Sequence, residues 1–311
     1  MESSAEGTAA ALDIECENCG AELVVEAYLK TVECPYCTSH SIVERPPTTG
    51  REEPTFGLAF QVEAERARAA VERWLKSRGL FAHSGLKAAT LETVRGVYVP
   101  AYLYGAVAEA DYSASIGENY TVTERYTDSK GRRRSRRRTK TEWRDLSGSY
   151  ARYVVDVLVT ASRGIPNAEL EAVEPFDLRG LRRYAPAMLS GWIAEEPSLP
   201  REGCRREAHA ETIERMGRWL EEFMPGDSHR DLAYECEVRD ELIDLVLLPL
   251  WVFAARYDPA KPPVRVLLNG QTGAIAGKVP LSPVKIAVAV TLGLSIALAA
   301  AFAFLSARGM S

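Results

Sequence analysis

Two pairs of cysteines near the amino terminus have the spacing of metal ligands. Cys16 and Cys19 form one C-x-x-C pair, and Cys34 and Cys37 form a second. Each C-x-x-C turn points two thiolates at one ion, and four thiolates give a closed tetrahedral zinc site. The sequence therefore predicts a structural Zn²⁺ in a zinc ribbon over residues 14–43. A disulfide pair or a redox C-x-x-C is the alternative.

The predicted ribbon is acidic. Lys30 is its only lysine or arginine, against five glutamates. Because so short a segment buries almost no hydrophobic core, metal binding would supply its folding energy. An acidic ribbon is poorly suited to phosphates. Protein docking or a structural role is therefore favoured over nucleic-acid binding.

An uncharged apolar run near the carboxy terminus has the length of a membrane span. Residues 286–305 would form a helix of about 30 Å, which matches the hydrocarbon core of a bilayer. The sequence therefore predicts one transmembrane helix in contact with membrane lipid, with a buried core helix as the alternative. Gly293 and Ala297 have a spacing that would let such helices pair, so a homo-oligomer is left open.

The orientation of this predicted span follows from charge and redox chemistry. Lys278 and Lys285 precede the run, which favours the amino-terminal side inside. Zinc-binding thiolates require a reducing compartment. The expected localisation is the inner (cytoplasmic) membrane, single-pass, with the bulk of the chain in the cytoplasm.

A dense basic stretch, residues 130–140, is expected to be an exposed loop between two strands. It has three interpretations: a solvated hairpin tip without a partner, a contact for anionic lipid, or a nucleic-acid contact. The last is least favoured because no aromatic residue lies within the run to stack on bases. Without these residues the chain keeps 30 basic against 43 acidic residues, so attraction to phosphate is focused here. They are Lys130, Arg132, Arg133, Arg134, Arg136, Arg137, Arg138 and Lys140.

Hydrophobic periodicity outlines the remaining organisation. Helical spacing predicts helices over about 62–78 and 205–223, and β-branched and aromatic runs predict strands between and after them. Asn269-Gly270 is a strong hairpin turn signal. Residues 1–13 are expected to be disordered and 44–54 to be a linker. The expected fold class is α+β: the ribbon, a mostly antiparallel α+β domain over 55–282, and one carboxy-terminal transmembrane helix.

Two segments of the chain have a similar sequence pattern. Residues 97–106 and 246–255 share an apolar pattern with a proline at Pro100 and at Pro249. Because proline cannot donate to a ladder, each strand is expected to be an edge strand or to carry a bulge there. The echo is interpreted either as chance or as a duplicated β-unit.

The sequence offers no catalytic constellation. It contains neither H-E-x-x-H nor G-x-S-x-G, and the glycines between Gly273 and Lys278 do not make a phosphate loop because Val279 follows the lysine. Cys204 and Cys236 have no recognisable base partner in sequence. The protein is therefore expected not to be an enzyme.

Several phrases together resemble a bacterial family of zinc-ribbon membrane proteins, often labelled primosomal protein N′ (replication factor Y) or superfamily II helicase-like. The resemblance covers nearly the whole chain and implies an architecture more than an activity. A helicase activity is not expected, because the chain has no phosphate loop. The phrases, besides the cysteine pairs, are residues 96–102, 141–143, 175–178, 191–192, 247–251 and 269–273.

The leading hypothesis is a non-enzymatic, membrane-tethered zinc-ribbon adaptor that recruits cytoplasmic protein partners to the inner membrane. The alternative is a membrane-associated nucleic-acid-binding protein that uses the ribbon and the basic stretch.

Overall fold

The structure is a computed structural model that describes residues 11–17, 21–26, 34, 36, 42–45, 52–127, 131–189 and 191–308. It is rich in β-structure, with 46% strand and 28% helix. The chain divides into two compact units. Unit 1 comprises Met1–Ala101, Thr160–Leu199 and Leu245–Ser311, and unit 2 comprises Tyr102–Val159 and Pro200–Asp244. Residues 55–282, expected as one domain, are thus shared between the two units.

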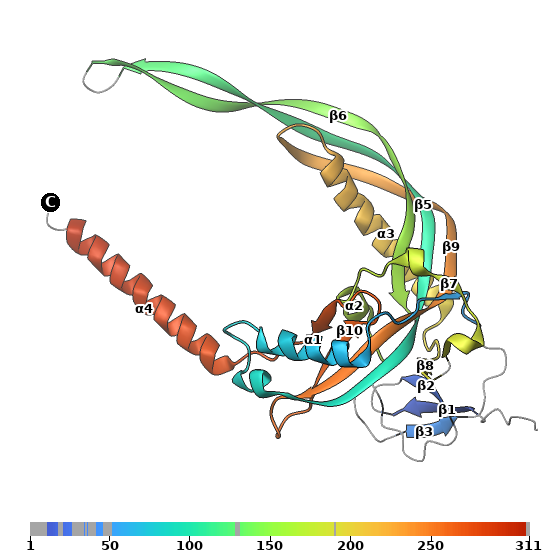
Figure 1. Cartoon of the computed structure of the whole chain (residues 1–311). Coiled ribbons are helices and arrows are strands. Elements are labelled where there is room, and N and C mark those ends of the chain that lie inside the picture. Colours follow the sequence, from blue (N-terminus) through green and yellow to red (C-terminus); the bar gives the residue numbers. More distant parts are fainter. Residues whose placement is uncertain are drawn as a thin grey trace, which may run out of the picture. The chain divides into compact units, whose positions relative to one another are not determined.

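The strands include three that are far longer than usual (Figure 1). The strands are β1 (Ala11–Cys16), β2 (Glu22–Glu26), β3 (Ile42–Arg45), β4 (Phe56–Gly57), β5 (Thr90–Thr127), β6 (Arg133–Thr160), β7 (Arg182–Arg183), β8 (Ile193–Glu195), β9 (Ser228–Arg256), β10 (Val264–Asn269) and β11 (Ile275–Gly277). The α-helices are α1 (Ala64–Lys76), α2 (Asn167–Glu171), α3 (Arg201–Phe223) and α4 (Pro283–Arg308), with 3-10 turns at Ser84–Ala88, Leu178–Gly180 and Pro186–Leu189.

Unit 1 is built on a sheet with strand order β11-β10-β9-β5-β8-β2-β1-β3. Helix α1 covers part of it, because Val71 and Leu75 recur on one helical face and are buried. They belong to one apolar cluster with Phe253 of β9 and Leu268 of β10. Helix α1 and the hairpin between β10 and β11 at Asn269-Gly270 confirm two expectations from the sequence pattern.

The two echoed prolines lie inside the sheet. In β9, the parallel partner β4 pairs at Val246–Leu247, and the antiparallel partner β10 pairs from Leu250 onward. Strand β5 pairs with β8 at Val97 and Tyr98. From Pro100 onward its neighbour is the segment that follows β6, where the Ala161 N–H donates to the Pro100 carbonyl at 3.0 Å. Each proline therefore stands where its strand changes neighbours, a place where a missing N–H is tolerated. The expectation of an edge strand was wrong, since both strands are interior, and the alternative expectation of a bulge stays a prediction.

Unit 2 consists of β5 from Tyr102 onward, β6 except its last residue, and β9 as far as Asp244, with α3 against them (Figure 1). Helix α3 buries one face, which includes Ala208, Met216 and Leu220. Opposite it, β5 buries every second residue, and most of these are alanines. Small side chains let a helix approach a sheet closely, so this run of alanines positions α3. The buried alanines are Ala106, Ala108, Ala110 and Ala114.

The expected zinc-ribbon fold was wrong. β2 pairs with β8 at Leu23↔Glu195 and Val24↔Ala194, so β1–β3 extend the sheet of unit 1 and gain their hydrogen bonds from it. Within the described residues, no group of three or more His, Cys, Asp or Glu side chains could hold a metal ion. Cys16 and Cys34 are buried, and Cys19 and Cys37 lie outside the described residues. Zinc as a structural cofactor stays an untested prediction.

The expected transmembrane helix and the inner-membrane localisation were also wrong. In the part of the chain that the structure describes, no helix is long and apolar enough to cross a membrane. The predicted span lies in α4, whose side chains are described only as far as residue 299.

Candidate nucleic-acid interface

The three-stranded sheet of unit 2 ends at one defined turn. Asp227 follows α3 and donates its backbone N–H to Gly117 O at 3.0 Å, while its carboxylate accepts from the backbone N–H of Asn119 at 2.7 Å. Gly226 has a positive φ of 85°, and a Cβ there would lie 2.7 Å from Ile116, so the turn requires glycine. Because β9 starts at Ser228, only β5 and β6 continue beyond this turn. We call residues 118–127 and 131–142 the basic ribbon.

Cross-strand contacts give the basic ribbon one constant register. Ser115 bonds Asp145 at 2.9 Å, and Thr141 bonds Asn119 at 2.7 Å. Farther out, the Arg136 guanidinium bonds the Glu124 carboxylate at 3.1 Å. In this register Tyr126 of β5 lies opposite Arg134, and Tyr120 lies opposite Lys140.

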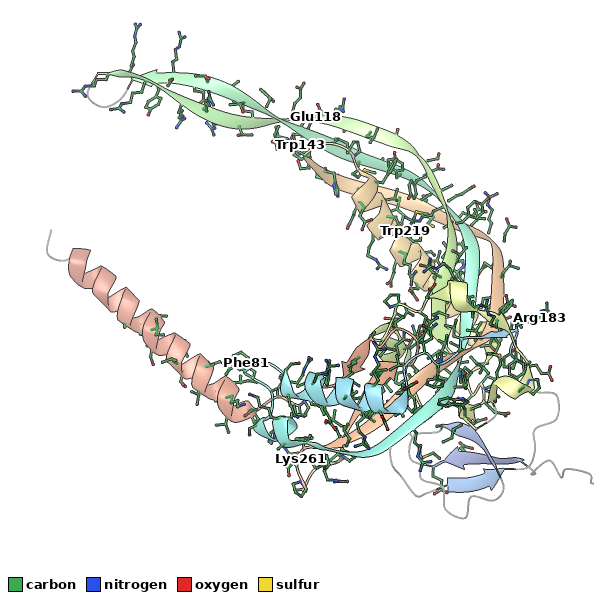
Figure 2. All side chains as sticks on the ribbon, in the orientation of Figure 1. Phe81, Glu118, Trp143, Arg183, Trp219 and Lys261 are labelled. Atoms are coloured by element: carbon green, nitrogen blue, oxygen red, sulfur yellow. The ribbon has the colours of Figure 1, made fainter. Side chains whose placement is uncertain are left out.

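The ribbon is basic on both faces. Because side chains alternate along a strand, residues with even numbers share one face and those with odd numbers share the other. Figure 2 shows side chains projecting from both sides of the two strands beyond Glu118 and Trp143. The even face carries Tyr120, Tyr126, Arg134, Arg136, Arg138 and Lys140 together with Glu118, Glu124 and Glu142, and the odd face carries Arg125, Arg133 and Arg137.

Only part of this charge is neutralised. Glu124 pairs with Arg136 at 3.1 Å and with Arg138 at 3.8 Å, and both arginine side chains are about 60% exposed. Exposed pairs of this kind contribute little and exchange readily for another anion. Within the described residues, Arg133 and Arg137 form no ion pair. The basic ribbon thus keeps an excess of exposed positive charge.

The sequence predicted these cations but placed them in a loop. The structure puts Arg133–Lys140 in strand β6, where all these side chains are exposed. Arg132 precedes the strand, and Lys130 lies outside the described residues. The aromatic residues that the basic run lacks come from β5, where Tyr120 is 46% and Tyr126 is 45% exposed. The Arg136 guanidinium lies 5.6 Å from the Tyr126 ring centroid. The sequence therefore contained the aromatic residues, but on β5, the strand that pairs with β6.

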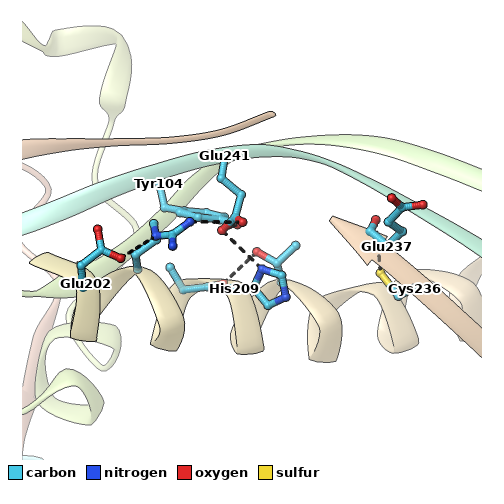
Figure 3. A network of polar contacts seen from close by, with 9 residues as sticks. Tyr104, Glu202, His209, Cys236, Glu237 and Glu241 are labelled. Carbon is cyan, nitrogen blue, oxygen red and sulfur yellow. Dashed lines mark hydrogen bonds and ion pairs between the residues drawn. The ribbon is translucent and has the colours of Figure 1, made fainter. Parts of the chain in front are cut away.

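A polar network ties α3 to the sheet of unit 2 (Figure 3). The buried Tyr104 hydroxyl donates to Glu241 at 2.7 Å, and His209 Nδ1 and Arg205 lie 3.3 and 3.5 Å from the same carboxylate. Burial alone would raise the pKa of Glu241, but hydrogen bonds from Tyr104 and His209 and the Arg205 charge outweigh it. The pKa of Glu241 is therefore held below its usual value.

This network predicts a pH-dependent stability. A carboxyl with a depressed pKa stabilises the fold fully above its unfolded value of about 4.3, and loses that effect as pH falls through the lower folded pKa. Glu241→Gln, which mimics the protonated side chain, is expected to cost about 1 kcal/mol at pH 7. In urea unfolding, the difference from wild type should shrink toward zero near pH 3. A difference that stays constant between pH 7 and pH 3 would contradict this role.

Neither cysteine of unit 2 has the properties of a reactive nucleophile. Burial, with help from Glu207, raises the pKa of the Cys204 thiol to about 11. Burial also raises the pKa of Cys236. Thiolates, not thiols, are nucleophilic, so both residues are inert thiols at neutral pH.

Most phrases that carry the family resemblance meet in the core of unit 1. Asn269 is fully buried and donates to the backbone carbonyls of Val173 and Pro175. A Cβ on Gly96 would lie 2.4 Å from the Trp192 ring, which stacks on Phe60 at 4.0 Å. These residues therefore have a packing role. Residues 141–143 are the exception, since they lie at the base of the basic ribbon.

Comparison with known proteins gives one relative and no function. No family model matches the chain, and no solved structure matches it. Among curated proteins it is similar to YdjG of Bacillus subtilis (strain 168), which is described as an uncharacterized protein. The two are 26% identical over 252 residues, which cover 77% of this chain and 67% of YdjG. The resemblance to the zinc-ribbon membrane family stays a prediction.

Proposed function

We propose that this protein is a non-enzymatic DNA-binding protein that inserts the basic ribbon into a groove of duplex DNA. The observation that carries the proposal is the presence of cations on both faces of a two-stranded ribbon. A two-stranded β-ribbon fits the major groove of B-DNA, which is about 12 Å wide. In that position the two outer edges of the ribbon lie beside the two phosphate backbones, so long arginine side chains from either face can reach phosphates.

The same arrangement disfavours a flat partner. An anionic membrane surface would contact one face of the ribbon and leave Arg133 and Arg137, or Arg134 and Arg138, turned away from it. The lipid interpretation also depended on a membrane anchor that the described residues do not provide. Duplex DNA is therefore the better match for charge on two faces.

The adaptor hypothesis loses two of its supports. It relied on a zinc ribbon for docking and on a transmembrane helix for tethering, and both were corrected above. A protein partner stays an untested prediction. The basic run itself lacks aromatic residues, but Tyr120 and Tyr126 are exposed on the even-numbered face of the same ribbon.

A charge reversal on the odd face tests the proposal. The double variant Arg133→Glu and Arg137→Glu should weaken binding of a fluorescent 20-base-pair duplex about 100-fold at 100 mM salt. Two phosphate contacts are lost and two repulsions replace them. Binding is measured by fluorescence anisotropy, and the thermal midpoint should not change because neither residue forms an ion pair in the described structure.

The matched control is Arg66→Glu with Arg68→Glu, two exposed arginines of α1 that carry the same charge change. It should bind the duplex as the wild type does. Equal weakening by both pairs would show a nonspecific charge effect and would overturn the proposal. So would wild-type binding to vesicles containing anionic lipid without measurable binding to the duplex.

A further inference from the structure

Unit 1 contains a cavity of about 780 Å³ that the proposed DNA contact does not use. Its volume is in the range of small-molecule sites, about 300–1,000 Å³. The lining is contributed by α1, the start of α2, β10, β11 and the segment before β10. Its apolar wall includes Trp74, Pro166, Pro263, Leu267 and Ile275.

One side of the cavity is rigidly anchored. The Tyr36 side chain lines it and donates its buried hydroxyl to Glu195 at 2.5 Å. Glu195 is 2% exposed and also accepts from the Ser162 hydroxyl at 2.5 Å. Burial first, and then Glu195, raise the pKa of Tyr36 well above its usual value, so the phenol stays neutral. This wall is formed before any ligand arrives, which lowers the entropy cost of binding.

The polar part of the cavity has an excess of positive charge. Three cations, Arg78, Arg265 and Lys278, line it with a single carboxylate, Glu169. Glu169 pairs with Arg265 at 2.7 Å and with Lys278 at 3.6 Å. The Arg78 guanidinium lies over the Trp74 ring at 3.9 Å and therefore stays in the cavity wall. Glu169 therefore pairs with two of the three cations, and the lining keeps a net positive charge that a second anionic group could neutralise.

We propose that this cavity binds a small amphipathic anion, with an apolar or aromatic body against Trp74 and the prolines and one carboxylate or phosphate beside Arg78 and Lys278. Apolar lining with a few charged groups is the usual composition of such sites. Bonds from cations to an anionic group are among the stronger hydrogen bonds in proteins. This site lies in unit 1 and is independent of the basic ribbon in unit 2.

A matched pair of probes tests charge recognition. 1-Naphthaleneacetate and 1-naphthaleneacetamide have the same ring and nearly the same size, but only the first is an anion. Isothermal titration calorimetry on the full chain should show saturable 1:1 binding of the acetate and at least tenfold weaker binding of the acetamide. Equal affinities, or no binding of the acetate at millimolar concentration, would overturn the proposal.

Two variants locate the binding. Ala168→Trp fills the cavity from an exposed position on α2 and should abolish binding of both probes. Arg78→Gln with Lys278→Gln should weaken the acetate about tenfold and leave the acetamide unchanged. The controls are Ala69→Trp and Arg66→Gln with Arg68→Gln, exposed α1 residues that do not line the cavity. Binding of the acetate that survives Ala168→Trp would place it elsewhere and contradict the assignment. Thermal midpoints confirm that each variant is folded.

Discussion

Replacing Asn269 by alanine is expected to lower the free energy of unfolding by about 3–4 kcal/mol. The Asn269 side chain is fully buried and makes four hydrogen bonds. Its oxygen accepts from the backbone N–H groups of Gln271 and Thr272 at 2.9 and 3.0 Å. Its nitrogen donates to the carbonyls of Val173 and Pro175 at 3.0 and 3.2 Å.

The magnitude follows from what alanine leaves behind. A buried donor or acceptor without a partner costs about 1–3 kcal/mol, and this substitution removes the partner of several at once. Urea denaturation measures the change. Asn119→Ala is the control, because Asn119 is exposed and its side chain, within the described residues, pairs only with Thr141. It should cost less than about 0.5 kcal/mol. If the free energy of unfolding of Asn269→Ala lies within about 1 kcal/mol of the wild-type value, the hydrogen bonds of Asn269 do not stabilise the core.

Shortening the basic ribbon is expected to abolish duplex DNA binding without unfolding the protein. In the observed register Tyr120 lies opposite Lys140, so residues 121–139 can be replaced by Asn-Gly, which closes a two-residue hairpin. The variant should bind duplex DNA at least 1,000-fold more weakly, because the rest of the chain is net acidic. Its thermal midpoint should change by no more than about 2 °C, because none of the described residues in this stretch is buried.

A variant with an uncharged ribbon shows whether the charge of the ribbon or its length is needed for DNA binding. Substituting glutamine for the six basic residues of β6 from Arg133 to Lys140 keeps the strands and removes the charge. It should lose as much affinity as the shortened variant. Retention of wild-type affinity by the shortened protein would mean that DNA binds elsewhere.

Local features of the fold could be predicted from the sequence, because they depend on neighbours in the chain. Ala67, Val71 and Leu75 recur at helical spacing and are the buried face of α1. The turn at Asn269-Gly270 forms the expected hairpin. Helix α3 begins at Arg201, slightly before its expected start, and ends at Phe223 as expected.

Features that depend on distant partners could not be predicted in the same way. Pro100 and Pro249 suggested sheet edges, but their strands exchange one neighbour for another at the proline, which only the topology reveals. The cysteine spacing suggested a self-contained ribbon, whereas β2 pairs with β8 more than 160 residues away. The cations of β6 meet Tyr120 and Tyr126 only because the register of a long hairpin brings them to one face.

The salt dependence of duplex DNA binding tests the central claim most directly. If about six arginines and lysines of the ribbon neutralise phosphates, the logarithm of the association constant should fall with the logarithm of salt concentration with a slope near −5. The Arg133→Glu, Arg137→Glu variant should reduce the slope by about 2. We predict this pair of slopes for the 311-residue chain between 50 and 200 mM salt. A slope near zero, or one that is identical in the wild type and the variant, would contradict DNA binding by the basic ribbon.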